Sequence, residues 1–161
     1  MEWIALIAIF ISLALIGFFS GIEIAFVSAN KLSIELNKKQ GTSSGRTWGE
    51  FADRPTKFIA TTLVAVNIVM VIYGLLVGDM LYPVWKWIKE HLPAGSANYV
   101  EYIKLLVETL LSTAIILFVE FLSKAYFRAR SNNILSSDLV SYIVRFFYWL
   151  LSSLAALFVS A

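Results

Sequence analysis

A carboxylate inside a long apolar segment is the feature of this sequence with the clearest chemical meaning. Glu23 is the only charged side chain between Trp3 and Ala29. A carboxylate at membrane depth is costly, so an intramembrane acid by default marks a path for an ion, a proton or a polar substrate. The alternative is that Glu23 lies at the membrane boundary and reaches water; the first basic residue, Lys31, follows about two turns later.

Other polar side chains with oxygen atoms lie in all three apolar runs. Asn67 is the one strongly polar residue of the second run, and Ser20 lies about one turn before the first carboxylate. In the third run Glu120 and Lys124 stand at i and i+4, so they can pair on one helix face. Structural interpretations stay open, because Asn commonly joins membrane helices by hydrogen bonds and an ion pair can simply stabilise a helix end.

The polar groups of the three runs offer oxygen ligands and no nitrogen or sulfur ligand. They are Ser20, Glu23, Asn67 and Glu120. Hard divalent cations choose such oxygens, and Mg²⁺ typically keeps several waters while using one or two carboxylates. The sequence therefore predicts a site for a hard divalent cation such as Mg²⁺ at Ser20, Asn67 and Glu120, with Glu23 a weaker candidate; Glu108 ranks below Glu120. Asn67 is near mid-span and both predicted acid ligands are near span ends, so convergence requires a kink or a re-entrant arrangement.

The elements that must position these groups are membrane helices. The chain has 161 residues, of which 59% are hydrophobic and 15% are charged, far from the profile of a soluble domain. A spanning helix needs about 20 apolar residues, and we predict spans at about 3–29, 56–78 and 102–123. The first lacks the basic lead-in and the cleavage pattern of a signal peptide. With no cysteine, neither a disulfide framework nor a thiolate metal site can form.

Basic residues predict the orientation of the spans. They are concentrated between the first two spans and after the third, at Lys31, Lys38, Lys39, Arg46, Arg54, Lys57, Lys124, Arg128 and Arg130. The positive-inside rule places both segments in the cytoplasm, and the N-terminus outside a cell (inner) membrane. Trp85 and Trp87 suit an aromatic belt at the outer surface. Topology alone explains the basic residues, and we expect no nucleic-acid partner.

The connections between the spans are predicted to contain little regular secondary structure. Residues 32–39 have helical spacing and are expected to continue the first helix into the cytoplasm. Residues 41–45 are expected to form a flexible turn, and 92–96 to break the outer loop. Pro55 suits the first turn of a helix, so the second helix is predicted to begin near Asp53 or Arg54.

The last segment, 137–161, is predicted to be an amphipathic helix, with Ser136 or Ser137 as its cap. Polar residues recur at three- and four-residue steps, at Asp138, Ser141, Arg145, Tyr148 and Ser152. Such a stripe suits a juxtamembrane or re-entrant helix lying against the cytoplasmic leaflet. The alternative, a fourth span at 146–161, is shorter than a spanning helix needs. The fold class is therefore an all-α membrane protein with three spans and this additional helix segment.

Small residues predict close helix packing. Gly17 and Gly21 form a G-x-x-x-G pair, which permits close approach of another helix. Ala60 and Gly74 add small residues to the second span. Because helix association in lipid depends on close backbone packing, we predict that the protein dimerises through its spans.

The first motif carries a resemblance to a known family. Residues 18–25, F-F-S-G-I-E-I-A, resemble the F-F-S-G-x-E-x-A signature that opens the transmembrane domain of the CorC/CNNM magnesium transporters. Residues 120–124, E-F-L-S-K, are similar to the end of that family's G-E-x-x-P-K motif, with Val119 and Ser123 in place of the glycine and the proline. Asn67 falls where the family has an asparagine-rich stretch, and Ala65-Val66 stand where Gly-Asn is common.

The resemblance implies a homodimer with three spans per subunit, a juxtamembrane helical hairpin and a Mg²⁺ site built from the three motif segments. It also implies export of Mg²⁺ coupled to Na⁺. Family members continue into cytoplasmic cystathionine-β-synthase-type modules, which we expect beyond Ala161. The departures at 65–66, 119 and 123 remove an amide oxygen and a proline-shaped helix end, which bears on affinity and transport.

Three functional hypotheses follow from the sequence. The favoured one is a transporter domain for Mg²⁺, and the second is a divergent, non-transporting membrane anchor or accessory module of the same family. The third, an intramembrane enzyme, has little support. The single histidine, His91, lies in the predicted outer loop, there is no G-x-S-x-G motif, and no serine has an evident base at span depth. We therefore predict that the protein is not an enzyme.

Overall fold

The computed structural model describes residues 2–91 and 97–159 and is helical throughout, with no strand in those ranges. The order of helices is α1 (Glu2–Ser28), α2 (Lys31–Lys39), α3 (Ser43–Asp53), α4 (Pro55–His91), α5 (Ala97–Ala129), α6 (Ser131–Leu135) and α7 (Asp138–Val159). Three of these helices are long and apolar enough to cross a membrane, over Trp3–Ser28, Pro55–His91 and Tyr99–Ala129. The predicted all-α class with three spans is confirmed.

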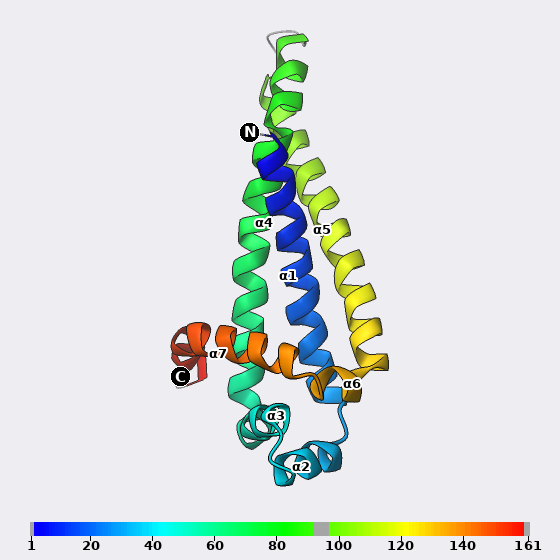
Figure 1. Cartoon of the computed structure of the whole chain (residues 1–161). Helices are drawn as coiled ribbons and strands as arrows, with labels where there is room; N and C mark the ends of the chain where they lie inside the picture. Colours follow the sequence, from blue (N-terminus) through cyan, green and yellow to red (C-terminus); the bar gives the residue numbers. More distant parts are fainter. Residues whose placement is uncertain (1, 92–96, 160–161) are drawn as a thin grey trace.

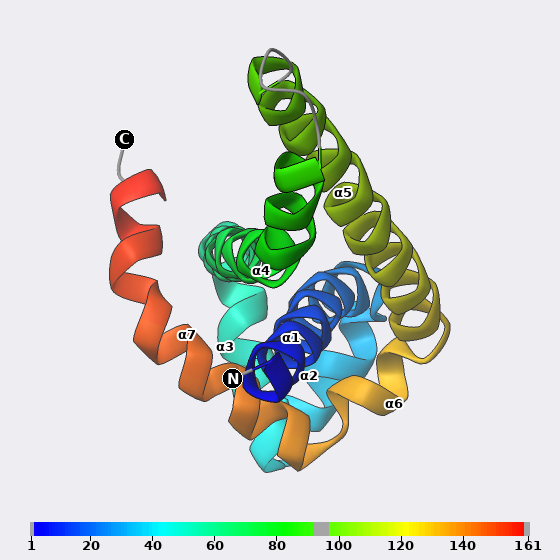
Figure 2. The ribbon, with the colours of Figure 1, turned by 90° about the horizontal axis from the view of Figure 1, so that it is seen from above.

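The three long helices form an upright group with α1 at its centre. Helix α1 packs along both α4 and α5, whereas α4 and α5 contact each other far less (Figures 1 and 2). Helices α2 and α3 lie below the group, and α7 runs across its lower part instead of along it (Figure 1). Because α1 is held from two sides, its residues face two different environments.

The face of α1 toward α4 forms an apolar core within the spans. Ile16 and Phe19 of α1 pack with Ala65, Val69 and Tyr73 of α4, and all five are less than a tenth exposed. On α4 these positions recur at helical spacing, which gives the helix one stripe directed at α1. The apolar stripe aligns α1 with α4 over several turns.

A second, aromatic core ties the juxtamembrane helices to the lower ends of the spans. The ring of Phe58, near the start of α4, lies 4.6 Å from Phe26 of α1 and 4.8 Å from Phe51 of α3 between centroids. Trp48 of α3 packs against the same group and is 1% exposed. Aromatic pairs at these separations add to the stabilisation from burial, so α3 is fastened to both α1 and α4.

The connection after α1 differs from the predicted continuous helix. Helix α1 ends at Ser28, and Asn30 begins a new helix by accepting a hydrogen bond from the backbone N–H of Leu32 at 3.0 Å. An Asn side chain in this position satisfies a free N–H of a helix start. The predicted flexible turn is also shorter than expected, because Thr42 caps α3 through the N–H of Gly45. Gly41, with φ of 72°, makes the turn itself.

The second and third long helices extend beyond their predicted ends. Helix α4 begins at Pro55, within two residues of the predicted start, but it continues through Pro83 to His91. Helix α5 begins at Ala97, and an ion pair joins Lys89 to Glu101 near this end of the hairpin. Most of the predicted outer loop is therefore helical, and the predicted break at 92–96 lies outside the described residues.

Helix α7 is amphipathic, and part of its polar stripe contacts the protein, whereas Asp138 and Arg145 are exposed. Asp138 accepts a hydrogen bond from the N–H of Ser44 at 3.1 Å, Ser141 is 1% exposed, and Tyr148 packs against Phe51. The outward face is apolar, with large exposed side chains at Leu139, Tyr142, Phe146, Trp149 and Leu150. Asp138 and Tyr148 of the expected polar stripe thus contact α3, and the apolar side is the one presented to lipid.

Candidate metal site between α1 and α5

Two of the predicted ligands meet between the first and third spans. The hydroxyl of Ser20 on α1 donates a hydrogen bond to Oε1 of Glu120 on α5 at 2.8 Å, across 100 residues of sequence. Ser20 is 2% exposed and the Glu120 side chain is 16% exposed. A hydrogen bond to an ionised carboxylate is stronger than one between neutral groups, so this contact fixes the direction of the Glu120 carboxylate.

The other carboxylate oxygen of Glu120 faces a cation from its own helix. Lys124 Nζ lies 3.4 Å from Oε2 of Glu120, one turn along α5, and its side chain is 47% exposed. Glu23 of α1 is half-buried and close enough to Glu120 and Lys124 for their charges to act on it. The group therefore holds two carboxylates, one hydroxyl and one ammonium, which leaves it a formal charge of −1 when all three titratable groups are ionised.

Glycines bring the two helices close enough for this contact. A Cβ atom placed on Gly17 would lie 2.5 Å from the hydroxyl of Ser123 and 3.3 Å from Val119, and one on Gly21 would lie 2.6 Å from the ring of Phe127. The prediction that Gly17 and Gly21 permit close packing of a helix is confirmed, and that helix is α5 of the same chain. Val119 and Ser123, at the positions of the motif departures, fill the space that Gly17 leaves.

Asn67 does not join this group in the structure. Its side chain is exposed on α4, and its Nδ2 donates to the carbonyl of Leu63 in the same helix at 2.8 Å. The neighbouring Ala65 and Val66 are buried against α1, so Asn67 points to a different side of α4. The structure therefore brings Ser20 and Glu120 together, with Glu23 beside them, and leaves Asn67 apart.

Two buried hydroxyls at the same level were not among the predicted ligands. Thr61 and Thr62 of α4 are 3% and 4% exposed, and each donates to a carbonyl of its own helix, that of Lys57 and Ile59 respectively. A hydroxyl that donates in this way keeps lone pairs for another partner. The adjacent threonines were a visible signal, but threonine is common in membrane helices and does not by itself indicate a ligand.

The arrangement can hold a cation but has few strong ligands. No group of three or more His, Asp or Glu side chains with metal-binding geometry occurs within residues 2–91 and 97–159. Two carboxylates with a hydroxyl match an ion that keeps part of its water shell, as Mg²⁺ does. Glu108 lies elsewhere on α5, where its Oε1 is buried with no hydrogen-bond partner among the described residues.

Comparison with known proteins gives one match. The family model of the cyclin M (CNNM) transmembrane N-terminal domain matches residues 6–161, nearly the whole chain. No curated protein and no solved structure matches the chain.

Proposed function

Because the chain belongs to the family of cyclin M transmembrane N-terminal domains, we propose that this multi-pass membrane protein binds Mg²⁺ and exports it in exchange for Na⁺. The observation that carries the proposal is the hydrogen bond between Ser20 and Glu120 across two spans. A carboxylate held inside a membrane protein is costly and marks an ion path by default. The CorC/CNNM motifs recognised in the sequence supply both of these residues.

The contacts of Glu120 suggest how the site would receive an ion. Ser20 contacts one carboxylate oxygen of Glu120 and Lys124 the other. An arriving Mg²⁺ with several waters would displace Lys124 from its oxygen, because two cations repel each other at one oxygen. The half-exposed Lys124 side chain can turn toward water. Lys124 would therefore compete with Mg²⁺ for Oε2 of Glu120.

Asn67 would join the site only in a second conformation. Its side chain now bonds to its own helix and faces away from α1. A transporter needs at least two arrangements around a central site, and a rotation of α4 relative to α1 would bring the Asn67 amide oxygen toward Glu120. We propose that Ser20, Glu23 and Glu120 are the ligand residues of one arrangement and that Asn67 joins them in the other.

The exposed faces of α4 and α5 support a homodimer. Gly74 and Gly78 of α4 form a second small pair, and a Cβ on either would meet nothing within 4 Å. None of the most apolar part of α5 is buried inside the chain. A second copy packing at these glycines would gain the close backbone contact that membrane helices require. The glycine pair of α1 is not available for this role, because α5 occupies it.

The orientation of the protein is part of the proposal. Helices α2 and α3 carry most of the basic residues between the first two spans, so the positive-inside rule places them in the cytoplasm and the N-terminus outside an inner membrane. The Ser20–Glu120 group lies nearer this end of the spans than the opposite end. Mg²⁺ would therefore enter the site from the cytoplasm.

A non-transporting accessory module is the second candidate. It is favoured by the position of Asn67 and by the absence of a third carboxylate in the described part of the site. Ion binding separates the two functions, because an anchor has no need of a site that binds Mg²⁺.

Replacing Glu120 with glutamine tests the proposal most directly. Glu120→Gln keeps the shape and removes the charge, so we expect Mg²⁺ affinity in calorimetry to fall by more than about 100-fold, beyond the range seen for outer-shell partners of metal sites. The matched control is Glu108→Gln, the same change on the same helix away from the site. The parent should also bind less Mg²⁺ as the pH falls, since a carboxylate ligand must be deprotonated. Equal affinity of Glu120→Gln and the parent would make Glu120 structural and support the accessory module.

A further inference from the structure

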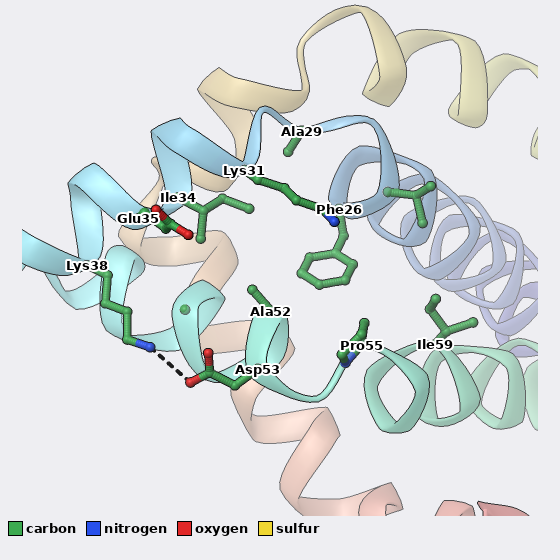
Figure 3. A pocket seen from close by; sticks show the side chains of 12 residues that line it. Phe26, Ala29, Lys31, Ile34, Glu35, Lys38, Ala52, Asp53, Pro55 and Ile59 are labelled. Atoms are coloured by element: carbon green, nitrogen blue, oxygen red, sulfur yellow. Dashed lines mark hydrogen bonds and ion pairs between the residues drawn. The ribbon is translucent and has the colours of Figure 1, made fainter.

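A pocket of about 400 Å³ lies at the level where the spans leave the membrane, away from the Ser20–Glu120 group. Its walls come from the end of α1, from α2 and α3, and from the first turns of α4 (Figure 3). The volume is in the range of small-ligand pockets. None of the proposed Mg²⁺ ligands lines this pocket.

The apolar part of the pocket continues into a surface suited to lipid. Phe26 and Ile59 line it from the two spans, and Ile34 lines it from α2. Val27 of α1, which also lines the pocket, and Leu32, the residue after Lys31 on α2, are 61% and 62% exposed. Large apolar side chains next to a span end are typical of a segment that touches the acyl region of the bilayer. The pocket therefore opens where lipid molecules are present at high concentration.

The polar part of the pocket carries both signs of charge. Lys38 and Asp53 neutralise each other through an ion pair of 2.9 Å. Lys31 and Glu35 also line the pocket and stand one turn apart on α2, yet no ion pair joins them in the described part of the chain. Lys31 extends toward Phe26, whereas Glu35 stays beside Ile34 (Figure 3). A lysine that precedes glutamate at this spacing is the less favourable order for pairing.

We propose that this pocket binds the headgroup of a zwitterionic phospholipid with a primary amine, of the phosphatidylethanolamine type. The phosphate would lie at the Lys31 ammonium and the ethanolamine ammonium at the Glu35 carboxylate. The glycerol backbone would rest on Phe26 and Ile59, with the acyl chains toward Val27. A net neutral pair of separated charges complements this headgroup better than an anionic one, because an anion would face Glu35. The proposal does not depend on ion transport.

Native mass spectrometry of the delipidated protein in detergent tests the proposal. Dioleoyl phosphatidylethanolamine, phosphatidylcholine and phosphatidylglycerol would be added at equal concentration. We expect the ethanolamine lipid to bind about tenfold more tightly than the choline lipid, which has no N–H donor for Glu35. Phosphatidylglycerol, whose anionic headgroup would face Glu35, should also bind more weakly than phosphatidylethanolamine. Equal binding of all three lipids, or preference for phosphatidylglycerol, would overturn the proposal.

Charge variants test the two contacts separately. Lys31→Glu and Glu35→Lys should each lower binding of the ethanolamine lipid about tenfold. The double exchange should not restore binding, because a reversed headgroup would carry the glycerol away from Phe26 and Ile59. Lys39→Glu is the matched control, because Lys39 is an exposed lysine of the same helix that does not line the pocket. Circular dichroism melting would establish that each variant is folded. If Lys39→Glu lost as much lipid as Lys31→Glu, or if the double exchange bound the lipid as tightly as the parent, the assigned contacts would be wrong.

Discussion

The two faces of α1 make contacts of different kinds, one apolar and one polar. Toward α4, α1 presents Ile16 and Phe19 to an apolar stripe, and the contact continues below the spans into the aromatic group around Phe58. Toward α5, it presents Gly17 and Gly21, which bring the helices close, and Ser20, which bonds to a carboxylate. The α1–α4 contact resembles the apolar core of a domain. In the α1–α5 contact the helices are close because glycines have no side chain, and the interface contains a carboxylate. The comparison indicates that α4 supports the fold and α5 completes the site.

The largest expected effect lies on the α4 side. Phe58 is 1% exposed and contacts rings from α1 and α3, so Phe58→Ala should lower the free energy of unfolding by about 3–5 kcal/mol. Phe118→Ala, at a ring that is 64% exposed on α5, is the matched control. Thermal unfolding in detergent measures both variants, and the folded fraction of Phe58→Ala should keep its Mg²⁺ affinity. If Phe58→Ala lost as much free energy of Mg²⁺ binding as free energy of unfolding, the α4 contact would not be separate from the site.

A smaller effect on stability is expected where α1 meets α5. Gly21→Ala would put a methyl group 2.6 Å from the ring of Phe127, and overpacking of this kind costs about 1–3 kcal/mol. Because the same strain separates the helices, Mg²⁺ affinity should fall along with the melting temperature. The double variant Gly21→Ala, Phe127→Ala is the control, since it removes the ring that the added Cβ would meet. Unchanged ion affinity in Gly21→Ala would mean that helix spacing does not control the site.

Removing one hydroxyl should affect binding far more than folding. Ser20→Ala deletes the donor to Oε1 of Glu120, and we expect Mg²⁺ affinity to fall about tenfold, the lower end for a residue that orients a metal ligand. Ser12→Ala removes another buried hydroxyl of α1, one that bonds only to its own helix through the carbonyl of Ala8. Calorimetry on the two variants should separate them. Similar losses in both would show a general effect of polar groups in α1.

The smallest effect has the opposite sign. If Lys124 competes with the cation for Oε2 of Glu120, Lys124→Gln should raise Mg²⁺ affinity by about two- to fivefold, the scale of a partly exposed ion pair. Lys104→Gln, the same change at the other end of α5, should leave the affinity unchanged. A fall in affinity for Lys124→Gln would mean that Lys124 positions Glu120 and does not compete with the ion.

Some features of the fold were predictable because they depend on local composition. The spans follow from apolar length, and the start of α4 follows from Pro55, whose fixed φ suits a first turn. The end of α1 was not predictable from spacing, because residues 31–39 are helical as expected and only the Asn30 cap separates them from α1. Periodicity gives the type of an element but not a change in its direction.

The site was predictable in its residue types but not in its geometry. Ser20 and Glu120 were chosen for their oxygen chemistry, and the structure joins them by a hydrogen bond. The side on which Asn67 emerges depends on the rotation of α4, which its buried stripe against α1 decides. Part of the polar stripe of α7 contacts protein for a similar reason, because α3 offers the N–H of Ser44 to Asp138. A polar helix face predicts that its side chains meet polar groups. These groups can belong to a neighbouring helix as well as to water.

The break between α1 and α2 has a mechanical consequence. A continuous helix would act as a stiff rod and carry a push on α2 directly into the span, but the chain at Asn30 leaves the helical path and makes a joint. The N–H of Asn30 is 3.4 Å from the side-chain oxygen of Asn132 in α6, which pins this joint beside the end of α5. A load on α2 and α3 would therefore bypass the joint and pass through the aromatic group, from Phe51 and Trp48 of α3 to Phe58 of α4 and Phe26 of α1. A force applied below the membrane would reach both spans by side-chain contact instead of along a continuous backbone.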